Sequence, residues 1–590
     1  MHRPDPSPDD LGLLRAFEPV VRFTRGEYFF PVSVHNYVQH AALWTELPGG
    51  ESVIEASAES FDSGVLGRVE ESIPGQSTSL SGIMTGTESP KVRIPLKDRP
   101  PRLRGASRLA AVGLLGRLID ALNRLSLIFR GSVPGGSAAK SFLLQQAHLE
   151  PDRPAYYGRV VRDGDWVVCQ YWFFYSFNNW RSGFGGVNEH EADWEQVTVF
   201  LDGTGALDDA GLPAPRWVVF SAHDETGDDL RRRWDDPDLT LVEGRHPVVF
   251  AGAGSHSGAY LPGDYLISIE PPTQSTVLRF GRWMARVFTP WSTGAQNVGI
   301  PYVDYARGDG RAIGPGQGDP WYPEVIDDDT GWVRGFRGLW GHDTRDRLGG
   351  ERGPAGPRYE RDGTVRASWA APVGWAGLAK VAANPAVESD LLARRREQLQ
   401  ARLDELEDDI ARTGDALQVA AAGRYPGAPE VRVLAGEEAR LLAMRREQTR
   451  LRDEAASMGS AASDAAADPH AHLTHRNTPI APATGTRARL LSWWAVLSTP
   501  LILWMLGQIV HPAVGVSATA FAVWALVVLV SIEGFVRGKF LAVMGRFLLI
   551  LLAVVAAYFL WRDWRVVVGA TLGVSAITVL VVNLREAFRR

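Results

Sequence analysis

Four long apolar runs fill the last hundred residues, and they constrain the fold more than any other feature of the chain. They lie at 490–510, 514–532, 540–560 and 566–582. Each is close to the roughly 20 residues that a helix needs to cross a bilayer. We therefore expect residues 488–590 to form a bundle of four transmembrane helices.

Basic residues around these runs predict their orientation. Arg487 and Arg489 precede the first run, Arg537 and Lys539 follow the second, and more arginines end the chain. The opposite side would hold only His511, Arg562 and Arg565. Because cytoplasmic loops are enriched in Lys and Arg, we expect a plasma-membrane protein with its N-terminal domain and C-terminus in the cytoplasm.

The apolar runs lack a central set of ionisable residues, which favours an anchor over a pump or transporter. Gly569 and Gly573 form a small-xxx-small pair suited to close helix packing, within the bundle or between chains. The membrane itself is thus the first expected partner.

Composition limits the other classes. A chain of 590 residues is too long for one core, so three or four modules are expected. The net charge of -6 and the lack of a basic stripe give no case for nucleic-acid binding. The single cysteine, Cys169, excludes an intrachain disulfide framework and a cysteine-based zinc site.

The middle of the chain predicts a β-domain. Strands are expected at 156–162 and 165–175, joined by an Asp163-Gly164 turn, and then at 193–201, 216–221, 247–251 and 265–269. Short strands without interleaved helices favour an antiparallel β-sandwich. The expected fold is therefore mainly β, with a sandwich core at 136–345, its N-terminal part at 1–48 and a linker at 346–386.

Residues 49–135 are predicted to be an insertion, with a weakly structured Ser-, Gly- and Pro-rich part. Within it, apolar residues recur at helical spacing over 108–130, with arginines on the other side. This pattern fits a helix packed on the β-domain, and it also fits a basic amphipathic helix on a membrane surface.

Residues 387–457 are predicted to be helical. Leu392, Leu399 and Leu406 step by seven residues along a charged helix, and a break near Tyr425-Pro426 precedes a second helix. The pattern fits an antiparallel hairpin or a coiled coil between chains, which would make this segment a site of self-association. Residues 458–487, rich in Ala, Ser and Asp, are expected to be a disordered linker.

The main candidate site is the segment from His190 to Glu195. On a strand, Asp193 and Glu195 share a face, and His190 lies close enough to fold over the same spot. Two carboxylates roughly 5 Å apart repel by about 3 kcal/mol at an effective dielectric of about 20. A metal ion, an arginine or a shared proton must offset that repulsion.

Two further histidines follow expected strands. His223 and His256 both lie at loop entries, where functional residues concentrate. The His190 segment is not a zincin motif, since Trp194 stands where the second histidine is needed. The run 327–331 resembles a calcium loop only in composition, because Gly338 occupies the position of the bidentate glutamate.

Several aromatic and histidine motifs follow one another in order: 171–175 (Tyr-Trp-Phe-Phe-Tyr), 190–195, 221–223, 246–256 and 337–341 (Arg-Gly-Leu-Trp-Gly). Their order and spacing resemble those of the bacterial relatives of the vacuolar protein sorting-associated protein 62 (Vps62) family. The resemblance covers about 15–48 and 150–345. The insertion, the helical segment and the apolar runs lie outside it.

The His-x-x-Asp-Trp-Glu core is also similar to the signature of the necrosis-inducing NPP1-like proteins, which hold a divalent cation in a β-sandwich. By that similarity, His190, Asp193 and Glu195 are expected metal ligands, with His256 as the candidate fourth. The mixed nitrogen and oxygen donors suit Mg, Ca, Mn or Zn without choosing among them.

Three functions remain open from the sequence. The first is a membrane-anchored module that uses a divalent cation to bind a lipid headgroup, a glycan or a protein. The second is a metal-dependent hydrolase at the membrane face, with Glu191 or His223 as the base. The third is a scaffold without metal, so the sequence leaves open whether the protein is an enzyme.

Overall fold

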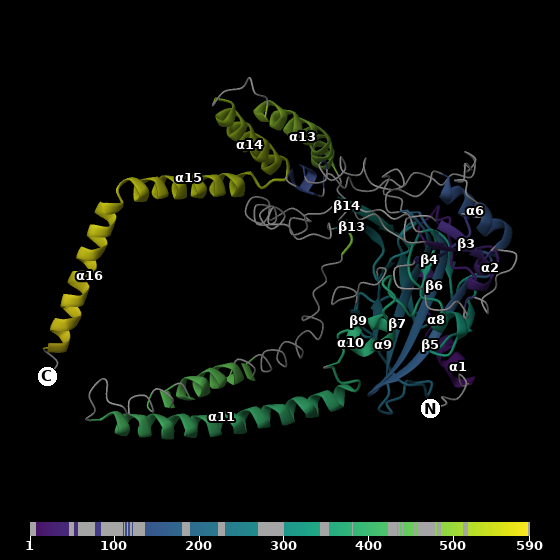
Figure 1. Cartoon of the computed structure of the whole chain (residues 1–590), viewed down its shortest axis with the longest axis horizontal. Helices are drawn as coiled ribbons and strands as arrows, with labels where there is room; N and C mark the ends of the chain where they lie inside the picture. Colours follow the sequence, from purple (N-terminus) through teal and green to yellow (C-terminus); the bar gives the residue numbers. More distant parts are fainter. Residues whose placement is uncertain are drawn as a thin grey trace. The chain divides into compact units, whose positions relative to one another are not determined.

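The computed structural model divides the chain into two units, which are described separately (Figure 1). The β unit comprises Met1–Leu103, Arg130–Tyr265 and Asp304–Ile480, and the helical unit comprises Arg104–Phe129, Leu266–Val303 and Ala481–Arg590. The structure describes residues 8–46, 52–56, 66, 77–83, 110, 112–114, 116–118, 121, 136–179, 189–221, 231–269, 300–342, 353–379, 381–422, 434, 437–438, 440–452, 455–456, 478–480, 485–510 and 517–587.

A six-stranded sheet forms the centre of the β unit, in the order β16-β5-β6-β7-β8-β9. Its long members β5 and β6 form the predicted antiparallel hairpin, turning at Gly164, whose φ of +58° suits glycine. The β7 strand pairs antiparallel with β6 along its whole length. The strand bounds are β5 Ala155–Asp163, β6 Trp166–Asn178, β7 His190–Asp202, β8 Pro215–Phe220, β9 Arg231–Arg233 and β16 Tyr322–Val325.

Both faces of this sheet are buried, because alternate residues of β6 and β7 enter different hydrophobic clusters. Tyr171, Phe173 and Val199 belong to a cluster with residues of the five-stranded sheet. Trp172 and Trp194 belong to a cluster with residues of the four-stranded sheet. The sheet is thus the middle layer of three, and the expected two-layer sandwich is corrected. Every residue of β6 and β7 is buried, as in sheets covered on both sides.

The two flanking sheets are mixed. The five-stranded sheet has the order β10-β11-β1-β15, with β12 on β11, and the four-stranded sheet has the order β17-β4-β2-β3. A third, two-stranded sheet is β13-β14. The bounds are β1 Val20–Arg22, β2 Ala42–Glu46, β3 Ser52–Ala56, β4 Ser77–Ser81, β10 Leu241–Val242, β11 His246–Ala251, β12 Gly258–Ala259, β13 Gly263–Ile269, β14 Ile300–Ala306, β15 Ala312–Ile313 and β17 Leu339–Trp340.

The expectation of purely antiparallel pairing is wrong. The β1 strand runs parallel to β11, β16 runs parallel to β5, and β17 runs parallel to β4. In each parallel pair, one strand has only two to four residues and its partner lies far away in sequence. A run of two to four apolar residues indicates a strand, but it does not indicate the partner strand or whether the two run parallel. The sequence pattern therefore predicts the existence of such strands better than their pairing.

Segments expected to lie outside the β-domain contribute to it. Trp369, Val373 and Leu378, from the expected linker at 346–386, lie in its hydrophobic clusters. The β3 and β4 strands come from the expected insertion at 49–135. Helical residues also outnumber strand residues in the described chain, so the expectation of a mainly β fold is corrected. The short helices are α1 Pro8–Phe17, α2 Val34–Gln39, α6 Ser137–His148, α8 Gly331–Gly335, α9 Ala367–Ala370 and α10 Pro372–Trp375.

The α11 helix, Pro385–Ala421, packs against the helical residues 440–452 within one chain. Leu399, Leu403 and Leu406 form a small cluster with Leu451. Arg402 of α11 pairs with a glutamate of the second helix at 3.1 Å. The leucine seam is therefore covered from inside the chain.

Four helices follow in the helical unit: α13 Thr486–Val510, α14 Ser517–Val536, α15 Phe540–Arg562 and α16 Trp564–Ala587. Three of the described helices are long and apolar enough to cross a membrane: Thr486–Met505, Phe540–Arg562 and Trp564–Glu586. The expected span at 514–532, in α14, is not among them. The shorter apolar stretch Val527–Val536 lies in α14.

Candidate functional site

The predicted site lies at the start of β7, where the strand backbone is irregular. Asp193 pairs with Tyr175 of β6, and His190 pairs with Asn178. Between them, Ala192 has a φ of +60°, an uncommon conformation for a residue with a side chain. The neighbouring carboxylates have different partners, since Glu191 contacts β4 and Asp193 contacts the loop after β11.

His256 is the positive partner of Asp193. Its Nδ1 lies 2.9 Å from Asp193 Oδ2, which also accepts a bond from Asn178 Nδ2 at 3.1 Å. On the other side of the imidazole, Nε2 lies 3.8 Å from Glu27 Oε1. All three side chains are buried. The histidine thus lies between two carboxylates that come from distant parts of the chain.

Burial alone would lower the pKa of His256, because it disfavours the charged imidazolium. The hydrogen bonds and negative charges of Asp193 and Glu27 outweigh burial and raise this pKa to about 9. At neutral pH the ring is therefore an imidazolium, which donates from Nδ1 to Asp193 and faces Glu27 with Nε2. The counter-charge required by the sequence argument is, for Asp193, a protonated histidine.

The protein holds this imidazolium firmly. The Tyr175 ring stacks on it with a centroid distance of 3.8 Å and an angle of 4° between the planes, an arrangement that favours a cation. The backbone N–H of Gly254 and those of Tyr28 and Phe29 donate to Glu27. We call Glu27, Asp193 and His256 the ion triad. It joins β7, the loop after β11 and the segment after β1.

The two remaining expected ligands have other surroundings. His190 Nδ1 donates to the carbonyl oxygen of Ala192 at 2.7 Å, which fixes the orientation of the ring. Glu195 is buried, and its negative charge raises the pKa of Arg366. Burial of that guanidinium has the larger, opposite effect and lowers its pKa to about 10. Arg366 Nη1 also lies 3.5 Å from Glu360 Oε2.

Glu191 is saturated with hydrogen bonds. Its carboxylate accepts from Ser81 Oγ at 2.7 Å and from Tyr37 Oη at 3.1 Å. Three backbone N–H groups also donate to it, at 2.7, 2.9 and 2.9 Å, from Gly82, Ile83 and His342. Burial raises its pKa, and these donors counteract that effect. A carboxylate with five donors ties β4 and the end of β17 to β7.

Asp193 has a counter-charge from within the chain, because the imidazolium of His256 lies 2.9 Å from its carboxylate. The divalent cation expected at the start of β7 stays a prediction. Within the described ranges, no three His, Cys, Asp or Glu side chains are arranged to hold a metal ion. His223 lies outside the described residues, so its expected role stays a prediction.

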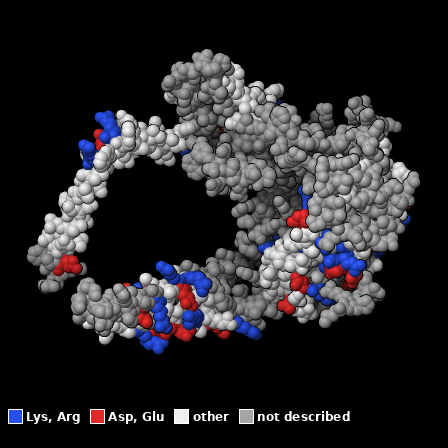
Figure 2. Space-filling model, viewed as in Figure 1, with Lys and Arg blue, Asp and Glu red and all other residues white. Residues whose placement is uncertain are grey.

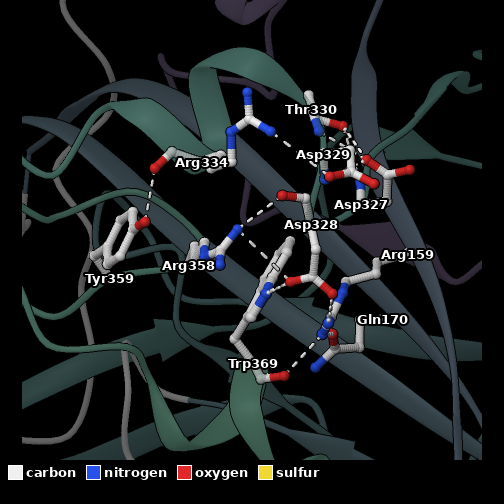
Figure 3. Close-up of polar contacts among 10 residues, drawn as sticks. All are labelled: Arg159, Gln170, Asp327, Asp328, Asp329, Thr330, Arg334, Arg358, Tyr359 and Trp369. Carbon is white, nitrogen blue, oxygen red and sulfur yellow. Dashed lines mark hydrogen bonds and ion pairs between the residues drawn. The ribbon is translucent and has the colours of Figure 1, made fainter. Parts of the chain in front are cut away.

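A second polar cluster lies around Asp328, in contact with Arg159 of β5, which bonds to Gln170 of β6 (Figure 3). Its carboxylate accepts from Trp369 Nε1 at 2.7 Å and from Arg159 Nη2 at 3.2 Å. Arg159 also donates to Gln170 at 3.1 Å. The neighbouring Asp327 accepts from the backbone and the hydroxyl of Thr330, which closes a turn before α8. The aspartate run is therefore a turn and a structural ion pair.

Sequence reasoning missed three members of these networks: Glu27, Arg366 and Asn178. The sequence does give one indication that Glu27 needs a partner, because this acid lies next to the apolar run Tyr28-Phe29-Phe30. A charge beside a buried run needs a partner, yet its partner follows more than two hundred residues later. Arg366 lay in a segment interpreted as a linker.

The chain matches no family model, no curated protein and no solved structure in comparisons with known proteins. The Vps62 and NPP1-like resemblances therefore stay predictions.

Proposed function

We propose that this chain is a membrane-anchored, non-enzymatic binding or scaffold protein. Its β unit would be a rigid module braced from within by the ion triad, without a structural or catalytic metal. The apolar surface of α15 and α16 is the observation that supports a membrane anchor. Figure 2 shows these helices as largely uncharged, with charges gathered at the bend between them, where Arg562, Asp563 and Arg565 lie.

An apolar surface of this extent is unstable in water. Leu549, Leu551 and Val554 of α15, and Leu572 and Ile577 of α16, are each more than half exposed. Soluble proteins seldom expose contiguous apolar patches of more than a few hundred square ångströms. A bilayer covers such a surface without a protein partner, and both helices have the length to cross it.

The finer topology belongs to the same proposal. We infer four spans, α13–α16, in a bacterial plasma membrane, with the β unit and the C-terminus in the cytoplasm. Arg487, Arg489, Arg537 and Lys539 support this orientation, because they flank the helix ends assigned to the cytoplasmic side. Gly569 and Gly573 would allow close packing between copies of α16.

The hydrolase is not proposed. Glu191, its candidate base, has both carboxylate oxygens engaged by five donors. A general base must reach the proton that it abstracts, and this group is buried between strands. The networks at β7 support a structural role better than a catalytic one.

Extraction from membranes tests the anchor. We expect the full-length protein to remain in the pellet after an alkaline carbonate wash. Two arginines at the centre of α15, Leu551→Arg and Val554→Arg, each cost about 2.5 to 3.5 kcal/mol of insertion free energy, so the double variant should become extractable. The matched control carries Val419→Arg and Leu442→Arg on the exposed surface of the helical hairpin. Wild-type protein in the supernatant would refute the proposal.

A further inference from the structure

Glu533 of α14 is a buried acid in the helical unit that the anchor alone does not explain. It lies three residues before the end of its helix, and its side chain is 1% exposed. An unpaired carboxylate at such a place would make α14 costly to bury or to insert. The structure gives it four donors from three chain segments.

The strongest donor comes from far away in the sequence. Arg117 binds the carboxylate with both terminal nitrogens, Nη2 to Oε2 at 2.6 Å and Nη1 to Oε1 at 3.3 Å. The Arg117 side chain is fully buried. Such a two-pronged pair fixes direction as well as distance, because the planar guanidinium matches the planar carboxylate.

The neighbouring helices complete the network. Trp494 of α13 donates to Glu533 Oε2, and Arg537 of α14 donates to Oε1, both at 2.6 Å. Ser498 of α13 accepts from Arg117 at 3.0 Å. One carboxylate therefore connects α13, α14 and the segment that carries Arg117.

The backbone around Arg117 is held as well. The carbonyl oxygen of Val112 accepts from Arg117 at 2.8 Å and from Arg537 at 2.9 Å, and that of Ala110 accepts from Arg537 at 2.7 Å. Leu114 lies in one apolar cluster with Ile502, Leu529, Val530 and Val543 of α13, α14 and α15. Polar and apolar contacts thus fix the same short stretch.

We propose that the segment 110–118 is a built-in component of the membrane anchor, in which Arg117 supplies the counter-charge that lets α14 bury Glu533. The anchor is then assembled from parts of the chain that lie far apart in sequence. The segment lies in the insertion at 49–135, and it is followed by most of the β unit before α13 begins.

This assignment replaces both alternatives that the sequence left open for 108–130. Leu114 and Leu118 of that stretch pack on α13–α15. Arg117, one of the arginines that would have faced solvent or lipid headgroups on an amphipathic helix, is instead paired inside the helical unit. The location of this unit in a membrane rests on the proposed function, whereas the pairing does not.

Tryptic cleavage after Arg117 tests the proposal in full-length protein purified in detergent. The buried arginine should resist cleavage in the wild type. Glu533→Gln removes the charge that holds it, and we expect cleavage after Arg117 to become at least about tenfold faster through local opening. The control is Glu586→Gln, an exposed glutamate at the end of α16, which should leave the rate unchanged. An unchanged rate in Glu533→Gln would overturn the proposal.

A double variant tests the pairing of Arg117 with Glu533 even where the single variants fail to fold. Glu533→Met leaves Arg117 buried without its carboxylate, so the detergent-purified yield should fall sharply. The double variant Arg117→Met with Glu533→Met removes both charges and should recover most of that yield, since apolar replacement of a whole buried pair is tolerated. A double variant no better than Glu533→Met would contradict the pairing. Carbonate extraction of the wild type tests the membrane location independently.

Discussion

At the scale of single residues, cationic side chains and hydrogen-bond donors of the same chain balance the buried carboxylates of the β unit. Asp193 and Glu27 flank the imidazolium of His256, the charge of Glu195 raises the pKa of Arg366 against the effect of burial, and Glu191 is surrounded by donors. Each acid lies in or beside an aromatic run that fills a core. Removing one partner leaves an uncompensated charge, so these side chains should be sensitive to substitution.

The ion triad predicts a dependence of stability on pH. The pKa of His256 rises from 6.5 to about 9 on folding, which corresponds to about 3 kcal/mol. Since the folded pKa is the higher one, this stabilisation is fully present below pH ~6.5 and is lost as pH rises through ~9. Thermal unfolding of purified protein, followed by tryptophan fluorescence between those pH values, should show a falling midpoint.

The variant His256→Asn provides the comparison, because asparagine tolerates the φ of +56° at this position. It should be less stable than the wild type at pH 6.5, and its midpoint should change much less toward pH 9. A wild-type midpoint that rises over this range would contradict the assignment of the imidazolium.

Glu191→Gln should destabilise the β unit by about 2 kcal/mol or more, because an amide cannot accept five hydrogen bonds. The control Glu397→Gln replaces an exposed glutamate of α11 and should change stability by less than about 0.5 kcal/mol. Denaturant titration of both variants measures the difference. Equal stability of the two would show that the network around Glu191 is dispensable.

At the scale of elements, local patterns predicted the long strands and helices well. The β5 and β6 hairpin, the β7 and β8 strands, α11 and the apolar helices all lie close to their expected positions. Their signals are local: a turn at Asp163-Gly164, alternation along β5, and leucines at heptad spacing. Such signals need no knowledge of distant residues.

The remainder depended on contacts between distant residues. Nothing near Val20–Arg22 indicates that it pairs in parallel with β11, and nothing near Asp193 indicates Glu27. Only a family resemblance places His256 near Asp193, as a metal ligand. The candidate site was placed on the correct strand, but the nature of its counter-charge was decided by tertiary structure. Arg117 shows the same limit, since its acid lies more than four hundred residues later.

The hairpin of α11 allows a prediction at this scale. Leu406 is buried in the small cluster between the two helices, so Leu406→Ala should cost about 2 to 3 kcal/mol locally. Val419→Ala, at a position 77% exposed, should have little effect. Amide hydrogen exchange over residues 385–421 measures both. Equal exchange in the two variants would indicate that this seam does not hold the helices together.

At the scale of the whole molecule, the proposed topology predicts which loops between the spans face the outside of the cell. Lys539 lies between α14 and α15, and Asp563 lies between α15 and α16. In intact cells, a membrane-impermeant maleimide should label Asp563→Cys, and it should label Lys539→Cys only after permeabilisation. The native Cys169 gives little background, because it is buried and burial raises the pKa of its thiol to about 12. The reverse labelling pattern would invert the proposed topology.

The central claim is that a protonated histidine, and not a metal ion, balances the acid at the start of β7. Elemental analysis of the purified full-length protein tests it most directly, with wild type compared with His190→Ala. The account predicts no stoichiometric Mg, Ca, Mn or Zn in either protein, and no change in the thermal midpoint on adding a chelator. One equivalent of a divalent metal in the wild type that is lost in His190→Ala would contradict it.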